Sequence, residues 1–120
     1  MSDVFIKSAI LNELYSQLQH KHIQVEKKSE KVNDAQGDIN LYLTIANLTL
    51  QAISTLIDTL TFFGNKNKNK KEYQEIKYYV NITLKNGQII NQKNLPYDKM
   101  QKIVHKAKEN FNEIAIIEIG

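Results

Sequence analysis

The residues best suited to metal chemistry in this chain are its three histidines, His20, His22 and His105. A His-x-His pair on a strand directs both imidazoles to one face, where they could supply two metal ligands. The chain has no cysteine, and no cluster of His, Asp and Glu stands beside the pair to supply a third ligand. We therefore expect no metal site and no bound cofactor.

Motifs of catalysis are missing as well. The four glycines stand apart at Gly37, Gly64, Gly87 and Gly120, so the chain has no Gly-rich phosphate-binding loop. It also has no nucleophile motif of the serine-hydrolase type, and no pair of carboxylates stands out from a solvated surface. The sequence therefore predicts a protein that is not an enzyme. The alternative, an enzyme of unrecognised type, would need a deep polar pocket.

Lysine is the residue type that gathers in a way suited to binding. All sixteen basic residues are lysine, and the formal net charge is +3. One group follows the most apolar stretch of the chain, and a second lies on or beside the polar face of the expected last helix. We take these as candidate partner-binding residues: Lys66, Lys68, Lys70, Lys71, Lys99, Lys102 and Lys106.

The chemistry of lysine favours a protein partner over nucleic acid. Arginine, which grips phosphates and guanine edges with two parallel hydrogen bonds, does not occur in the chain. Tyr73, Tyr78 and Tyr79 beside the lysine run could stack on bases. Tyr78, however, belongs to an apolar alternation, and aromatic residues are common in strands. We expect a partner such as an effector, a peptidase or a toxin-like protein.

Length and composition indicate one small folded domain. A chain of 120 residues with 42% hydrophobic and 24% charged residues can bury a single core. The first residues lack the basic start and apolar run of a signal peptide, and cysteine is absent. These features predict a cytoplasmic protein.

The first elements that must position these side chains are a helix and a strand. Apolar residues from Ile10 to Leu18 form one helical stripe within Asp3 to His20. For Val4 to Ile6 we favour a short strand before that helix, with Ser8 as the N-cap. Ile23 and Val25 alternate with polar residues and predict a second strand.

The most apolar stretch, Ile39 to Phe63, predicts a central helix capped by Asp38 and ended by Gly64. It is long enough to cross a bilayer, but its polar residues favour a helix in the core. The lysine-rich run after it predicts a flexible basic connector over residues 64–72.

The second half of the chain predicts a hairpin, a helix and a last strand. Asn86-Gly87 between two alternating runs is typical of a two-residue type I′ turn, which places Leu84, Ile82 and Ile89 on the core face. An apolar stripe follows Pro96, and the helix runs to Asn110. Ile114 to Ile119 predicts a mostly buried strand.

Together these elements predict a single α+β domain in the order β-α-β-α-β-β-α-β. We expect a mixed or antiparallel sheet with helices on one face, and a ferredoxin-like arrangement is one option.

This layout resembles the bacterial family of effector-associated constant component domains. The shared features are the long helix from Ile39 to Phe63, the basic break from Asn65 to Lys71, the strand Tyr78 to Gly87, a short return strand and a helix from Pro96. Where that family has arginines, this chain has lysines, and it adds the strand Ile114 to Ile119. The resemblance implies an adaptor or accessory module of a prokaryotic conflict or antiviral defence system, without catalytic residues.

Three functions stay open at this point. The favoured one is a non-catalytic protein-binding adaptor, which docks through a sheet edge or the lysine-bearing side of the last helix. A small inhibitor or immunity protein that binds a toxin or nuclease is the second. The third is a membrane-associated effector that inserts residues 39–63 and sets its lysines at the anionic leaflet. A homo-oligomer is compatible with each of them.

Overall fold

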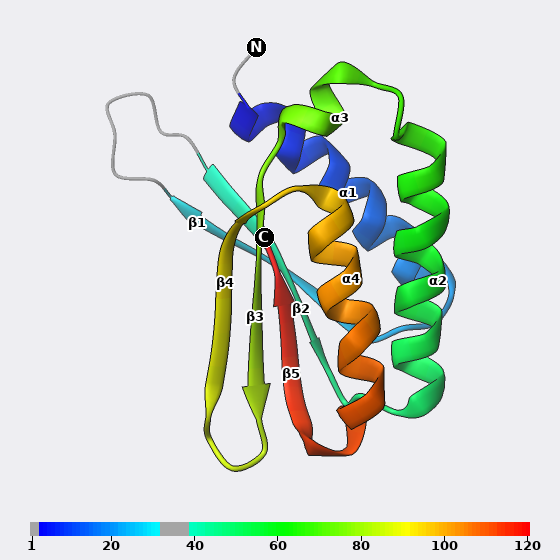
Figure 1. Ribbon diagram of the computed structural model, residues 1–120, viewed down its shortest axis with the longest axis vertical. Helices are drawn as coiled ribbons and strands as arrows, with labels where there is room; N and C mark the ends of the chain where they lie inside the picture. The colour runs from blue at the N-terminus through cyan, green and yellow to red at the C-terminus, as the bar shows by residue number, and fades with distance from the viewer. Residues whose placement is uncertain (1–2, 32–38) are drawn as a thin grey trace.

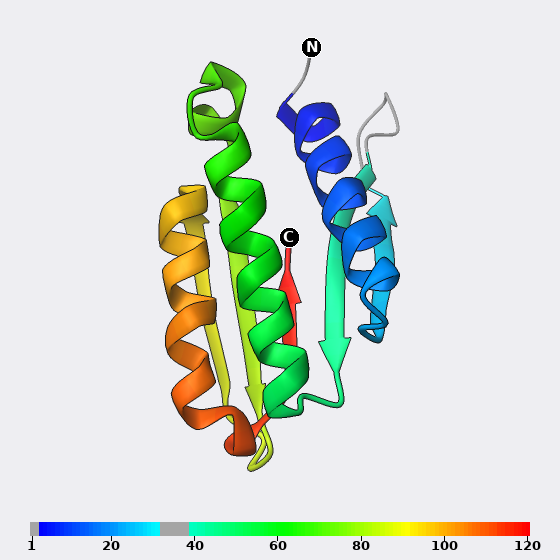
Figure 2. The ribbon, with the colours of Figure 1, turned by 90° about the vertical axis from the view of Figure 1, so that its right-hand side faces the viewer.

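The computed structural model describes residues 3–31 and 39–120 as a two-layer α+β domain. A five-stranded antiparallel sheet, in the order β1-β2-β5-β3-β4, carries its three long helices on one face (Figures 1 and 2). The predicted class, the single domain and the antiparallel sheet are confirmed. The strands are β1 (Val25–Lys31), β2 (Ile39–Ala46), β3 (Tyr78–Leu84), β4 (Ile89–Leu95) and β5 (Ile114–Ile119). The helices are α1 (Asp3–His20), α2 (Leu50–Asn67), the short α3 (Lys71–Glu75) and α4 (Tyr97–Ala107). A 3-10 turn, Lys108–Glu113, extends α4.

Each helix covers a definite part of the sheet. Helix α1 packs on β1 and β2, α4 packs on β3 and β4, and α2 lies between the two helices (Figure 2). The Tyr97 hydroxyl donates a hydrogen bond to the Leu60 carbonyl at 2.8 Å, which joins α4 to α2 inside the core. The tyrosine ring also meets the edge of Tyr78 at 5.5 Å between centroids.

From β2 onwards the chain follows the β-α-β-β-α-β order that we expected. Strands β2 and β3 are parallel to one another, and β5 lies between them, antiparallel to both. Likewise β3 lies between β4 and β5. The sheet is thus built from two split β-α-β units, with β1 added at the outer edge of β2. The strand order differs from the ferredoxin-like option, because the strand between β2 and β3 is the last strand, β5, and not β4.

The expected strand at Val4 to Ile6 is wrong, because these residues form the first turn of α1. Ile6 stands four positions before Ile10, so it continues the apolar stripe of the helix instead of starting a new pattern. Both side chains pack against the core. Ser8 accordingly lies within the helix and is not its N-cap.

The expected single helix from Ile39 to Phe63 is also wrong. Residues 39–46 form β2, because Leu41, Leu43 and Ile45 alternate with half-buried residues and face the core. Asn47, with a φ of 55°, turns the chain, and the Thr49 hydroxyl accepts a hydrogen bond from the Ala52 N–H to cap α2. Asp38, the expected cap, lies outside the described residues.

This correction removes the segment that the membrane alternative needed. Within the described ranges, every helix is too short or too polar to reach across a bilayer. It also changes one of the features on which the family resemblance depended.

The expected connector at residues 64–72 is largely helical. Gly64 is buried inside α2 and does not end it, and the Asn67 side chain, also buried, donates to the Phe63 carbonyl at 2.9 Å. A turn then leads into α3. We interpreted the repeated Asn-Lys composition as a loop, but it includes the buried Asn67, whose side-chain hydrogen bond stabilises the last turn of the helix.

The C-terminal elements agree with expectation. Pro96 is the N-cap of α4, and Tyr97, Met100, Val104 and Ala107 form its buried side. Ile114, Ile117 and Ile119 are buried in β5, which lies in the interior of the sheet.

Candidate functional site

Strand β4 is an exposed edge of the sheet. Residues Ile89 to Asn94 are all exposed, and Leu95 is the first buried residue of the strand. Ile89 is 60% exposed and Ile90 39%. An edge strand of this kind offers unpaired backbone groups to another chain.

The hairpin determines which side chains of β4 face the helices. The Leu84 N–H donates to the Gln88 carbonyl, and the Gly87 N–H to the Leu84 carbonyl, so the loop has three residues. Gly87, with a φ of 94°, forms the bulge of such a loop. The expected two-residue turn is therefore wrong.

The extra loop residue shifts the register by one position, and a shift of one exchanges the two faces of a strand. Ile89 stands opposite Thr83 on the open face of the sheet, and Ile90 stands opposite Ile82 on the helix side. Our placement of Ile89 in the core is thus corrected, whereas Ile82 is buried as expected. Ile90, to which the sequence pattern assigned no role, faces the helices.

The peptide groups of Ile89 and Asn91 point away from the sheet. On its other side, β3 pairs with β5, and Tyr79 exchanges two hydrogen bonds with Gly120 there, at 2.7 and 3.1 Å. Since residues of an antiparallel strand bond alternately to the two sides, Val80 and Ile82 bond toward β4, to Gln92 and Ile90. The residues of β4 between these partners direct N–H and C=O outward.

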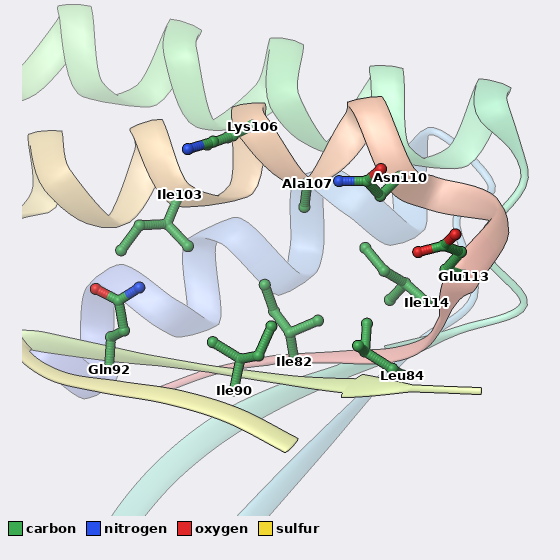
Figure 3. A pocket seen from close by; sticks show the side chains of 10 residues that line it. All are labelled: Ile82, Leu84, Ile90, Gln92, Ile103, Lys106, Ala107, Asn110, Glu113 and Ile114. Atoms are coloured by element: carbon green, nitrogen blue, oxygen red, sulfur yellow. The ribbon is translucent and has the colours of Figure 1, made fainter. Parts of the chain in front are cut away.

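Beside this edge, a pocket of about 260 Å³ opens between α4 and the sheet. Figure 3 shows Ile82 and Ile90 pointing up from the strands toward Ile103 and Ala107 of the helix. The floor and back are aliphatic, and polar groups stand at the rim. The lining residues are Ile82, Leu84, Ile90, Gln92, Ile103, Lys106, Ala107, Asn110, Glu113 and Ile114.

The opposite edge, β1, has a different character. Glu26, Lys27 and Lys28 are exposed, and Lys28 lies 3.6 Å from Glu26. Lys27 turns back to α1, where its ammonium donates to the Asn12 side chain at 2.9 Å and lies 5.0 Å from the centre of the Tyr15 ring. Charged side chains at this density disfavour pairing with another strand. Strand β4 is therefore the better edge for an added strand than β1.

The structure divides the candidate lysines between two regions. Lys66, Lys68, Lys70 and Lys71 lie around the end of α2 and the start of α3, at the opposite end of the molecule from the β3-β4 turn (Figure 1). Lys66 is 3.6 Å from Glu13 of α1.

The other three candidate lysines lie on α4. Lys99 and Lys106 are seven positions apart and share a side of the helix with Ile103. Lys106 lines the pocket. Lys102 is next to both on the helix surface, three positions after Lys99 and four before Lys106, on the side away from Ile103. The groove along β4 therefore has Lys106 at its rim and Lys99 on the same side of the helix, with Lys102 on their outer side, and the other four candidates lie away from it.

Among the residues that the structure describes, the histidines do not gather into a site with Tyr78 or Tyr79. His20, His22 and His105 are exposed. In the part of the chain that the structure describes, no three His, Cys, Asp or Glu side chains gather closely enough to hold a metal ion. Tyr78 is buried in the core, whereas Tyr79 lies on the open face with its hydroxyl 3.4 Å from the Glu118 carboxylate.

We compared the chain with known proteins. No protein-family model matches the chain, and neither a curated protein nor a solved structure is significantly similar to it.

Proposed function

We propose that this domain is a non-catalytic protein-binding module that takes up an extended segment of its partner as a sixth strand beside β4. The observation that carries the proposal is an edge strand with outward peptide groups that runs along an aliphatic pocket. An adaptor, or an inhibitor of a toxin-like protein, in the cytoplasm would use such a surface.

Strand addition explains why edge and pocket occur together. Main-chain hydrogen bonds to an edge strand supply affinity, and pockets for alternate side chains supply specificity. An added residue opposite Ile90 would direct its side chain to the helix side, as Ile90 does. The side chain would then contact Ile90, Ile103 and the pocket between them. Residues beside it in sequence would lie over the open face.

A matched pair of variants at Asn91 tests this function. Asn91→Pro removes an outward N–H and adds a ring at the edge, where proline is tolerated within a sheet. Asn91→Ala keeps that N–H. Both variants lose the hydrogen bond that the Asn91 side chain donates to Asn81 at 3.1 Å, so only the backbone donor and the ring differ between them.

The measurement is selection of displayed random peptides of about ten residues on the three proteins, after equal melting temperatures confirm folding. We expect wild type and Asn91→Ala to enrich peptides with alternating apolar residues, and Asn91→Pro to lose at least tenfold in affinity for them. Enrichment that is equal on all three proteins, or that fails on wild type, would exclude β4 as the binding edge.

A further inference from the structure

Positive and negative side chains are distributed unevenly along the groove, and this distribution indicates which charge the added segment must have. Lys106 stands at the rim of the pocket, and Lys99 lies two turns earlier on the same side of α4. The acidic group in the pocket lining is Glu113, at the end nearer to Leu84 and Ile114 (Figure 3). The half of the groove beside Gln92 and Ile103 is therefore basic.

Because side chains alternate along an added strand, the charge distribution of the groove predicts which residues the partner's segment carries and how far apart they stand. Side chains opposite Ile90 and opposite Gln92 both point to the helix side, and they are two residues apart. The first meets the aliphatic part of the pocket. The second meets the basic half, next to Lys106.

A second copy of this chain fits the groove poorly. If two copies paired through β4, each would set the lysine side of its α4, with Lys99 and Lys106, toward the same side of the other copy. Like charges facing across an interface cost affinity and suppress the wrong partner. Charge complementarity thus favours an acidic occupant.

We propose that the partner of the β4 groove is an acidic extended segment, in which an aliphatic residue fills the pocket and a Glu or Asp two positions away faces Lys106 and Lys99. This inference rests on the function proposed above and adds the chemistry of the ligand. The aliphatic anchor supplies burial, and the acidic residue supplies orientation and a faster association.

Three synthetic peptides with a fluorescein label serve as probes. The first is Ser-Thr-Glu-Thr-Ile-Thr-Glu-Thr-Ser, which reads the same in both directions and so tests binding whichever way the strand runs. The second has lysine in place of both glutamates, and the third has alanine in place of isoleucine. We expect the first to bind at least tenfold more tightly than the other two at low salt.

Charge reversal on the protein is the second arm. Lys99→Glu with Lys106→Glu should weaken binding of the acidic peptide at least tenfold and reverse the preference toward the lysine peptide. The matched control, Lys68→Glu with Lys71→Glu, changes the net charge equally at the far end of the molecule. It should alter binding by less than about twofold, because salt screens charges that distant.

The outcomes separate the two proposals. Peptides that need an intact Asn91 N–H but bind equally with glutamate or lysine would leave strand addition in place and overturn the acidic partner. Equal losses in both charge-reversal proteins would also overturn it. A dimer in sedimentation experiments that Asn91→Pro dissociates would show that a second copy occupies the edge, contrary to this proposal.

Discussion

At the scale of single residues, the most unusual group in the core is the hydroxyl of Tyr78. It is buried and has no hydrogen-bond partner among the described residues. The ring packs against Tyr97, and the ammonium of half-buried Lys7 lies 5.8 Å from the ring centre while donating to the Lys77 carbonyl at 3.1 Å. Burial raises the pKa of Tyr78 above its ordinary value of 10.0, and desolvation lowers the pKa of Lys7.

Tyr78→Phe should therefore cost no stability at neutral pH. A buried polar group left without a partner costs about 1–3 kcal/mol, and phenylalanine avoids that cost with nearly the same shape. Urea denaturation at pH 7 should give an equal or higher free energy of unfolding for the variant.

The same substitution should change the response to alkaline pH. Because the pKa of Tyr78 is raised on folding, the folded protein keeps its proton where the unfolded chain has lost it, so stability falls as pH rises above 10.0. Tyr78→Phe removes this contribution. Lys7 is common to both proteins, so the gap between their unfolding free energies should widen from pH 9 to pH 11. A constant gap would mean that the hydroxyl is solvated.

At the scale of elements, the β3-β4 hairpin controls the candidate site because its loop sets the register of the edge strand. Gly87 has a φ of 94°, and the Asn86 side chain accepts a hydrogen bond from the Gln88 N–H at 2.9 Å. The conformation of this one loop places Ile90 beside the pocket and Ile89 on the open face.

Gly87→Ala should destabilise the protein by about 1 kcal/mol, because residues with a side chain disfavour a positive φ. Nothing lies within 4 Å of the added methyl group, so the cost is conformational and not a clash. Gly87→Asn should cost less, since asparagine visits this region more readily. Denaturant midpoints give the order, and a larger loss for asparagine than for alanine would contradict the assigned loop.

At the scale of the whole molecule, α2 is the element that unites the helical layer. It contacts both α1 and α4, and its own side chains Ile53, Leu56 and Leu60 are fully buried. It also accepts hydrogen bonds from both sides: the Lys21 ammonium donates to the Thr59 hydroxyl at 2.8 Å, and the Tyr97 hydroxyl donates to the Leu60 carbonyl. The two halves of the sheet thus share one core.

Two neighbouring positions on α2 test this arrangement. Leu60→Ala should cost about 2–5 kcal/mol, as truncations in a packed core do, and unfolding should remain a single transition. Phe62, 59% exposed, removes little area from water, so Phe62→Ala should change stability by less than about 0.5 kcal/mol. Thermal unfolding followed by circular dichroism would reveal two transitions if the halves of the domain were independent.

Much of this fold could be predicted from local patterns. The apolar stripe that includes Leu11, Leu14 and Leu18, the helix after Pro96 and the strands at Tyr78 and Ile114 all follow from periodicities of 3.6 or 2 within a few residues. Such patterns depend on which face of an element is buried, and burial of one face is already visible in the order of residue types.

Other features depend on partners far along the chain. Residues 39–46 form a strand because β1 and β5 supply hydrogen bonds on its two sides, whereas the run of apolar residues by itself was compatible with a helix. The extra residue in the β3-β4 loop likewise decided the register, which the Asn-Gly pair alone did not specify.

The class of the fold, the helical stripes and the presence of a hairpin follow from residue order alone, since these arise from contacts and conformational preferences between near neighbours. The position of β5, which is last in the chain but enters the middle of the sheet and leaves β4 at its edge, emerges only in the folded molecule. Chain order does not encode that choice, because it results from how three helices bury their apolar faces on one sheet together. The candidate site, a strand edge beside a pocket under α4, exists only as a consequence of that packing.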